Sequence, residues 1–201
     1  RVLGKLYQPG VPRAPGDALL GYVRSAHARL HARTAETPGG PLGSSLTLLW
    51  VLEGRAWWVQ VGQTRGWIYR DRQLIRLTPQ HTRGEFAARS GHTVPSDPGA
   101  LAQAFIYGSR GLGDDTALYL EPGLDTGSEW LQAGDRLLLG TGGLWGSLDE
   151  RSITDALRAT PDPKGAAGVL VDRARAAGER GPVTAVIGAV TRVPAAKIGR
   201  A

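Results

Sequence analysis

The chain has 201 residues, of which 41% are hydrophobic and 21% are charged, so it can form one folded domain. No apolar run reaches the ~20 residues that a membrane-spanning helix needs, and Arg1 to Lys5 do not open a signal peptide, so we expect a cytoplasmic protein without a membrane partner. The absence of cysteine excludes disulfides, thiolate zinc sites and a cysteine nucleophile. The formal net charge of +6 comes from scattered basic residues, which favours a solvated surface over a nucleic-acid site.

The first half of the chain is predicted to be a helix followed by an antiparallel meander. Residues 1–16 are rich in Pro and Gly and are expected to be irregular. Apolar residues from Leu19 to Leu30 recur at helical spacing, which predicts a helix over 17–35. Turn residues then recur about every eight positions, as in a meander. The expected strands are 45–52, 55–61, 66–70 and 73–77, and a short helix is expected at 82–89.

The second half is predicted to alternate strands and helices around a Gly-rich middle segment. Ser147 and Glu150 form a capping-box pattern, which predicts that Ser147 caps a helix ending near Ala159. Asp162 followed by Pro163 predicts a second helix, which ends at Ala177 before Gly178. The further expected strands are 116–121, 135–140 and 183–190, and the last of these is nearly continuous in apolar residues and is expected to be central.

Aromatic and histidine residues are further candidates for functional sites. Trp57 and Trp58 are adjacent in a strand and must point to opposite faces, and we expect most of the six tryptophans to be core residues. An exposed tryptophan would be a candidate anchor for a protein partner. His27 and His31 have helical spacing, but zinc needs a third ligand, so we interpret them as residues of a partly exposed helix face.

Three segments, in order, resemble conserved motifs of the type 2C metal-dependent Ser/Thr protein phosphatases. The first group is similar to the family's Gly-Thr-Thr, Val-Gly-Asp-Ser-Arg and Leu-Thr-x-Asp-His motifs, and comprises residues 45–49, 58–70 and 77–82. The second, residues 134–145, is similar to Gly-Asp-x-Leu-Leu-Leu-x-Ser-Asp-Gly-Leu-Trp. The third, residues 181–187, is similar to Asp-Asn-x-Thr followed by a strand. The resemblance implies an α+β fold with two packed antiparallel sheets flanked by antiparallel helices, a four-layer α-β-β-α sandwich, in a single domain over residues 1–201.

The same motifs lack the family's metal-binding carboxylates. Family members bind Mn²⁺ or Mg²⁺, and such hard cations take oxygen ligands, largely anionic ones. Gly142 replaces the Asp of Ser-Asp-Gly-Leu, and Gly181 and Pro182 replace Asp-Asn. No Asp-Gly-x-Gly-Gly segment is found upstream of Ser45. The resemblance therefore implies a degenerate member with no catalytic or metal-ligating residues and no cofactor.

Two weaker sets of candidate residues remain. Asp114 and Asp115 are adjacent in a Gly-rich stretch, where they are either weak metal ligands or, as we favour, part of a solvated turn. Arg65, Thr141 and Thr184 fall in the three matching motifs and could retain vestigial contacts to an anion.

These observations favour a pseudophosphatase, a binding or regulatory module without hydrolytic activity, whose partner is a kinase or a phosphoprotein. The alternative is an active Ser/Thr phosphatase with an atypical or incomplete Mn²⁺ or Mg²⁺ site. A third possibility, a nucleic-acid-binding domain, predicts a contiguous basic face that the scattered arginines do not provide.

Overall fold

The computed structural model describes residues 15–34, 44–79 and 124–194, which fall into two compact units interleaved along the chain. Unit 1 comprises Arg1–Leu48, Trp58–Arg65 and Thr78–Gly127; unit 2 comprises Leu49–Trp57, Gly66–Leu77 and Ser128–Ala201. The helix predicted at 82–89 and the strand predicted at 116–121 lie outside the described residues. Within the described ranges, no helix is long and apolar enough to cross a membrane.

Helix α1 (Pro15–Thr34), in unit 1, confirms the predicted N-terminal helix. Leu19, Val23 and His27 recur every four residues and are at most 5% exposed, so they form one buried stripe along the helix. The expectation that His27 lies on a partly exposed face is therefore wrong, because it continues the apolar stripe.

A three-stranded sheet contains β1 (Leu46–Leu52), β2 (Arg55–Val61) and β5 (Leu124–Trp130), in the order β1-β2-β5. The predicted turn between β1 and β2 is confirmed: Glu53 and Gly54 have φ values of 51° and 76°, as a two-residue hairpin turn requires.

Strand β5 was not predicted, because its sequence is rich in residues that are poor strand formers. A methyl group placed on Gly127, in the middle of β5, would lie 2.6 Å from Cε2 of Trp58, so the Trp58 indole of β2 packs directly on the β5 backbone. A glycine inside a strand often marks such a close approach.

A four-stranded sheet has the order β4-β3-β6-β7 and contains β3 (Arg65–Arg70), β4 (Gln73–Arg76), β6 (Arg136–Gly140) and β7 (Ala185–Ala189). The β3–β4 and β6–β7 pairs are antiparallel. Among the strands that the structure describes, β7 is at an edge, and Val186 is 57% exposed. The prediction of a central last strand is therefore wrong, since its apolar run alternates between inward and outward positions.

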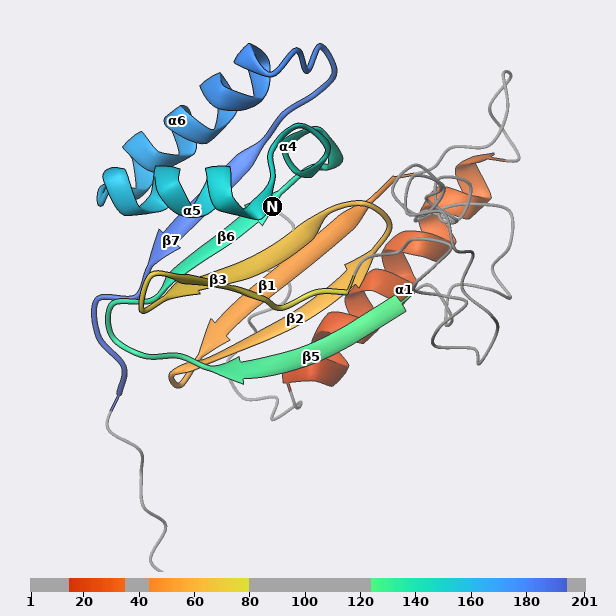
Figure 1. The fold of residues 1–201 in the computed structure, drawn as a ribbon. Helices are drawn as coiled ribbons and strands as arrows, with labels where there is room; N and C mark the ends of the chain where they lie inside the picture. Colours follow the sequence, from red (N-terminus) through yellow and green to blue (C-terminus); the bar gives the residue numbers. More distant parts are fainter. Residues whose placement is uncertain (1–14, 35–43, 80–123, 195–201) are drawn as a thin grey trace, which may run out of the picture. The chain divides into compact units, whose positions relative to one another are not determined.

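In unit 2, helices α4 (Gly142–Ser147), α5 (Glu150–Ala159) and α6 (Pro163–Ala176) lie together on one side of the four-stranded sheet, as Figure 1 shows. Their apolar side chains form one core cluster with the residues on that face of the sheet. The cluster includes Trp67, Leu138, Leu144, Ile153, Leu157 and Leu170. The opposite face carries a second cluster, which includes Ala56, Ile68, Leu131 and Leu137.

Local hydrogen bonds set the ends of α5 and α6. The N-cap of α5 is Asp149, whose Oδ1 accepts a 2.8 Å hydrogen bond from the backbone N of Ser152. Hydrogen bonding from Ser152 also lowers the pKa of Asp149. The predicted cap, Ser147, is instead the last residue of α4 and donates to the carbonyl of Gly143 at 2.6 Å, so the capping-box prediction is wrong by two residues.

The boundaries predicted for α6 are confirmed. Asp162 Oδ2 accepts from the backbone N of Gly165 at 2.6 Å, and Pro163 occupies the first turn. At the other end, Gly178 has a φ of 96°, and the backbone N of Glu179 donates to the carbonyl of Ala174 at 3.1 Å. This pattern is a Schellman motif, which directs the chain from α6 toward β7.

The prediction that most of the six tryptophans are core residues is wrong, because fewer of them are buried. Only Trp67 and Trp145 are buried, with ring centroids 5.5 Å apart. Three more, Trp50, Trp57 and Trp58, are half-buried. Trp130, at the end of β5, is 62% exposed.

Candidate functional site

In unit 1, the loop between β2 and β3 has the sequence Val-Gly-Gln-Thr-Arg at residues 61–65. Hydroxyl groups at and just before the start of β1 hold this loop, which is called the Val-Gly-Gln-Thr-Arg loop below. Ser45 Oγ accepts a hydrogen bond from the backbone N of Gln63 at 2.9 Å. The hydroxyls of Thr47 and Thr64 lie 2.7 Å apart. These contacts show why hydroxyl residues suit this stretch of β1: they fix the loop that precedes β3.

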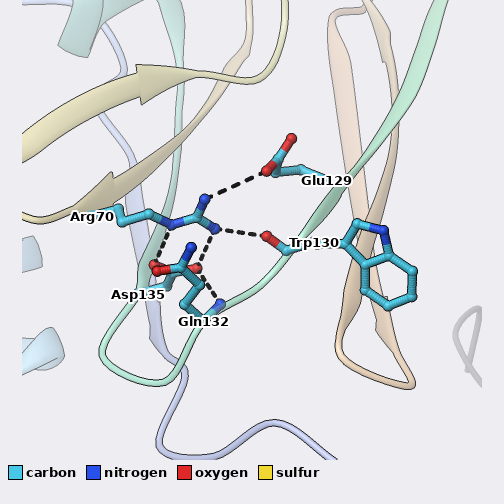
Figure 2. Close-up of polar contacts among 5 residues, drawn as sticks. All are labelled: Arg70, Glu129, Trp130, Gln132 and Asp135. Atoms are coloured by element: carbon cyan, nitrogen blue, oxygen red, sulfur yellow. Dashed lines mark hydrogen bonds and ion pairs between the residues drawn. The ribbon is translucent and has the colours of Figure 1, made fainter. Parts of the chain in front are cut away.

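The carboxylate that remains in the second motif, Asp135, is structural, as Figure 2 shows. Asp135 is 1% exposed, and its two oxygens accept from Nε and Nη2 of Arg70 at 2.9 and 2.8 Å. Its Oδ2 also accepts from the backbone N of Gln132 at 2.8 Å. Arg70 Nη2 donates to the carbonyl of Trp130 at 2.7 Å, and its Nη1 lies 3.5 Å from Glu129 Oε1.

The pairing with Asp135 stabilises the charged form of Arg70. The hydrogen bond to Asp135 is the main cause that raises the pKa of Arg70 above its ordinary value. The bidentate geometry of the pair links β3 to the turn before β6.

The second and third motifs meet in unit 2 through Thr141 and the segment before β7. Thr141 Oγ1 accepts from the backbone N of Thr184 at 2.9 Å and donates to the carbonyl of Pro182 at 3.3 Å. The backbone N of Thr141 also donates to the carbonyl of Thr184 at 3.1 Å. The structure thus brings two of the predicted anion contacts together. The third, Arg65, belongs to unit 1.

Gly181, which stands at a predicted ligand position, is next to a carboxylate that no sequence motif singles out. Glu179 Oε1 accepts from the backbone N of Gly181 at 2.6 Å. Ser147 Oγ donates to Glu179 Oε2 at 3.3 Å. Because Glu179 matches no motif, only its position two residues before Gly181 could have indicated it.

The described residues at the matching positions do not fit a pair of divalent cations. Gly142 and Gly181 offer no side-chain oxygen, and within 15–34, 44–79 and 124–194 no three His, Asp or Glu side chains gather in a group that could hold a metal ion. The weak candidates Asp114 and Asp115 lie outside these ranges. In the part of the site that is described, polar groups are used to hold backbone segments together.

Comparison with known proteins relates the chain to bacterial phosphatases, although no family model matches it. The Ser/Thr protein phosphatase PstP of Mycobacterium tuberculosis is 28% identical over 178 residues, a match that covers 86% of this chain. This chain spans about a third of the length of these relatives, since the match covers 33% of them.

Solved structures show the same fold. The M. tuberculosis PstP/Ppp phosphatase aligns with a TM-score of 0.74 at 24% identity, covering 95% of this chain and 79% of that one. The PstP catalytic domain in complex with two manganese ions gives the same score at 23% identity, covering 95% and 78%. The PPM phosphatase MsPP of Mycobacterium smegmatis, in complex with cacodylate, gives 0.63 at 27% identity, covering 85% and 72%.

These neighbours confirm the predicted fold class, an α+β architecture with two antiparallel sheets and helices. In sequence, this chain is similar to the Ser/Thr protein phosphatase PstP, and in fold it is similar to the catalytic domains of such phosphatases.

Proposed function

We propose that this chain is a catalytically inactive domain of the PPM type that acts in the cytoplasm as a protein-binding or regulatory module. The observation that carries the proposal is the loss of carboxylates in two matching motifs, at Gly142 and Gly181. Glycine has no side-chain oxygen, and Pro182, which stands in place of the family's Asn, has none either.

The chemistry of the family depends on those carboxylates. A metal ion must lower the pKa of its bound water from ~15.7 to ~7 to supply a nucleophile at neutral pH. Hard divalent cations are held by oxygen ligands, and anionic ligands offset their charge. A site without the two carboxylates lacks that charge, so the proposed module retains the fold and not the hydrolytic chemistry.

The alternative is an active Ser/Thr phosphatase that holds Mn²⁺ or Mg²⁺ through other carboxylates. The manganese-bound structure of the PstP catalytic domain favours this alternative, because it shows what a structural relative binds. Asp114 and Asp115 would be the first candidates for the missing ligands.

Hydrolysis of a phosphothreonine peptide across a titration with Mn²⁺ and Mg²⁺ tests the proposal. We expect no saturable, metal-dependent turnover at high protein concentration, with purified PstP as the positive control. Saturable turnover would overturn the proposal. Its disappearance in Asp114→Asn or Asp115→Asn would then assign the metal ligands.

A surface on unit 2 supports a role in binding a protein. Trp130 is 62% exposed, and Figure 2 shows its indole pointing away from Arg70 and Asp135. The guanidinium carbon of Arg55 lies 4.5 Å from the ring centroid of Trp57 and 5.1 Å from that of Trp130. A cation stacked between two indoles combines the side chains that dominate binding energy at interfaces.

We therefore propose that Arg55, Trp57 and Trp130 bind an acidic segment of a phosphoprotein. The net charge of +6 complements such a partner. Replacement of Trp130 by alanine is expected to weaken binding of a fluorescent phosphothreonine peptide with acidic flanks by roughly tenfold or more, as measured by anisotropy.

The control for this prediction is Arg151→Ala, which removes an exposed positive charge from α5. It should leave the affinity unchanged, and neither variant should lower the thermal midpoint appreciably, because both side chains are exposed. Equal peptide affinity of wild type and Trp130→Ala would exclude this surface as the binding site.

A further inference from the structure

The network around Gly181 points to a role for Glu179 that the motif comparison does not assign. An ideal Cβ built on Gly181 would lie 2.9 Å from Glu179 Oε1, which is closer than a real Cβ approaches another heavy atom, so the flexible end of the Glu179 side chain would have to move. A side chain at position 181 would therefore displace the Glu179 carboxylate from its present position. The carboxylate lies directly beside the place that such a side chain would start from.

The carboxylate of Glu179 is bonded on both oxygens. Oε1 accepts from the backbone N of Gly181 at 2.6 Å, and Oε2 accepts from Ser147 Oγ at 3.3 Å. Ser147 is at the end of α4, whereas Gly181 precedes β7. Glu179 thus links α4 to the segment before β7 through a single side chain.

Further contacts hold the same segment against α6 and α4. Arg175 Nη1 donates to the carbonyls of Glu179 and Gly181 at 2.9 and 2.7 Å. A methyl group on Gly143 would lie 2.6 Å from the carbonyl oxygen of Pro182, so α4 and this segment are in direct contact. Hydrogen bonds between residues of the chain therefore connect the second and third motifs.

We propose that Glu179 is an internal carboxylate that takes the place of the side chain missing at position 181, and that it clamps residues 179–184 to α4 without a metal ion. The inference deepens the proposed function, since it rests on the assignment of Gly181 as a former ligand position. It predicts that Glu179 and an acidic residue at position 181 exclude each other.

A double-mutant cycle in metal-free buffer with chelator tests the proposal, with the thermal midpoint of unfolding, Tm, as the readout. Glu179→Ala should lower Tm by about 4–6 °C, because two hydrogen bonds to a charged acceptor are lost. Glu179→Gln keeps the shape and one acceptor oxygen, and should recover about half of that loss. Gly181→Asp should lower Tm by at least as much as Glu179→Ala, because the new carboxylate would lie beside that of Glu179 and repel it.

The double variant Glu179→Ala with Gly181→Asp decides the proposal. We expect its Tm to be no lower than that of Gly181→Asp alone, because the repulsion is gone. Gly181→Asn is the matched control: it should destabilise less than Gly181→Asp when Glu179 is present, and equally when residue 179 is alanine. Additive Tm losses, or an unchanged Tm in Glu179→Ala, would overturn the clamp.

This outcome is separate from that of the hydrolysis experiment. Metal-dependent turnover would defeat the proposed function but leave the measured coupling between positions 179 and 181 intact. An additive cycle would defeat the clamp and leave the proposed function standing.

Discussion

Replacement of Asp135 by alanine is expected to lower the free energy of unfolding by about 3–5 kcal/mol, because removing one partner of a buried ion pair leaves the other charge uncompensated. The Arg70 side chain is only 14% exposed and would lose both of its bonds to the carboxylate. The backbone N of Gln132 would lose its acceptor as well. Urea unfolding monitored by tryptophan fluorescence measures the loss.

Glu129→Ala is the matched control, since Glu129 is bonded to the same guanidinium group but is more exposed to solvent than Asp135. Its side chain is 42% exposed and its oxygen lies 3.5 Å from Arg70 Nη1, so this variant should cost about 0–1 kcal/mol. If the two variants lose the same small amount, the carbonyl of Trp130 and water are sufficient to satisfy Arg70, and the pair is not a structural requirement.

The parts of the fold that local chemistry determines could be predicted from the sequence. Asp162, Pro163 and Gly178 define both ends of α6, because a cap and a left-handed residue act within one helical turn. The turn at Glu53 and Gly54 is equally local. The single-domain assignment over 1–201 stays a prediction.

The parts that depend on contacts distant in the sequence could not be predicted. Strand β5 has weak intrinsic preference and is supported by Trp58, which packs on Gly127 from a strand 69 positions earlier in the chain. Ser147 and Asp149 are both competent caps, and Asp149 takes the role because Ser147 is engaged with Gly143 and Glu179.

The candidate site shows the same division. Thr141 and Thr184, two of the predicted anion contacts, lie next to each other because both flank strands that pair in the sheet, and their binding of an anion stays a prediction. Glu179 was missed because its role arises from the return of the chain after the Schellman motif, which carries no sequence signature for the carboxylate itself.

Replacement of Gly62 by alanine is expected to lower the free energy of unfolding by about 2–4 kcal/mol, through two independent effects. Gly62 has a φ of 84°, a conformation that disfavours a residue with a Cβ. The new methyl group would also lie 2.8 Å from Ser45 Cβ and 3.0 Å from Ser45 Cα. Any shift of Ser45 would disturb its bond to the backbone N of Gln63, so the clash cannot be relieved at no cost.

Two other glycines separate these effects. Gly178 has a φ of 96°, and a methyl group added there would meet no atom within 4 Å, so Gly178→Ala should show the conformational cost alone, about 1 kcal/mol. Gly168 lies in α6 with open space around it, and Gly168→Ala should stabilise by about 0.5–1 kcal/mol. The difference between the losses at Gly62 and Gly178, measured by urea unfolding, isolates the contact with Ser45. Equal losses in the free energy of unfolding would mean that Ser45 can move away from the new methyl group at no cost. The hydroxyl contacts at the start of β1 would then contribute little to holding the Val-Gly-Gln-Thr-Arg loop.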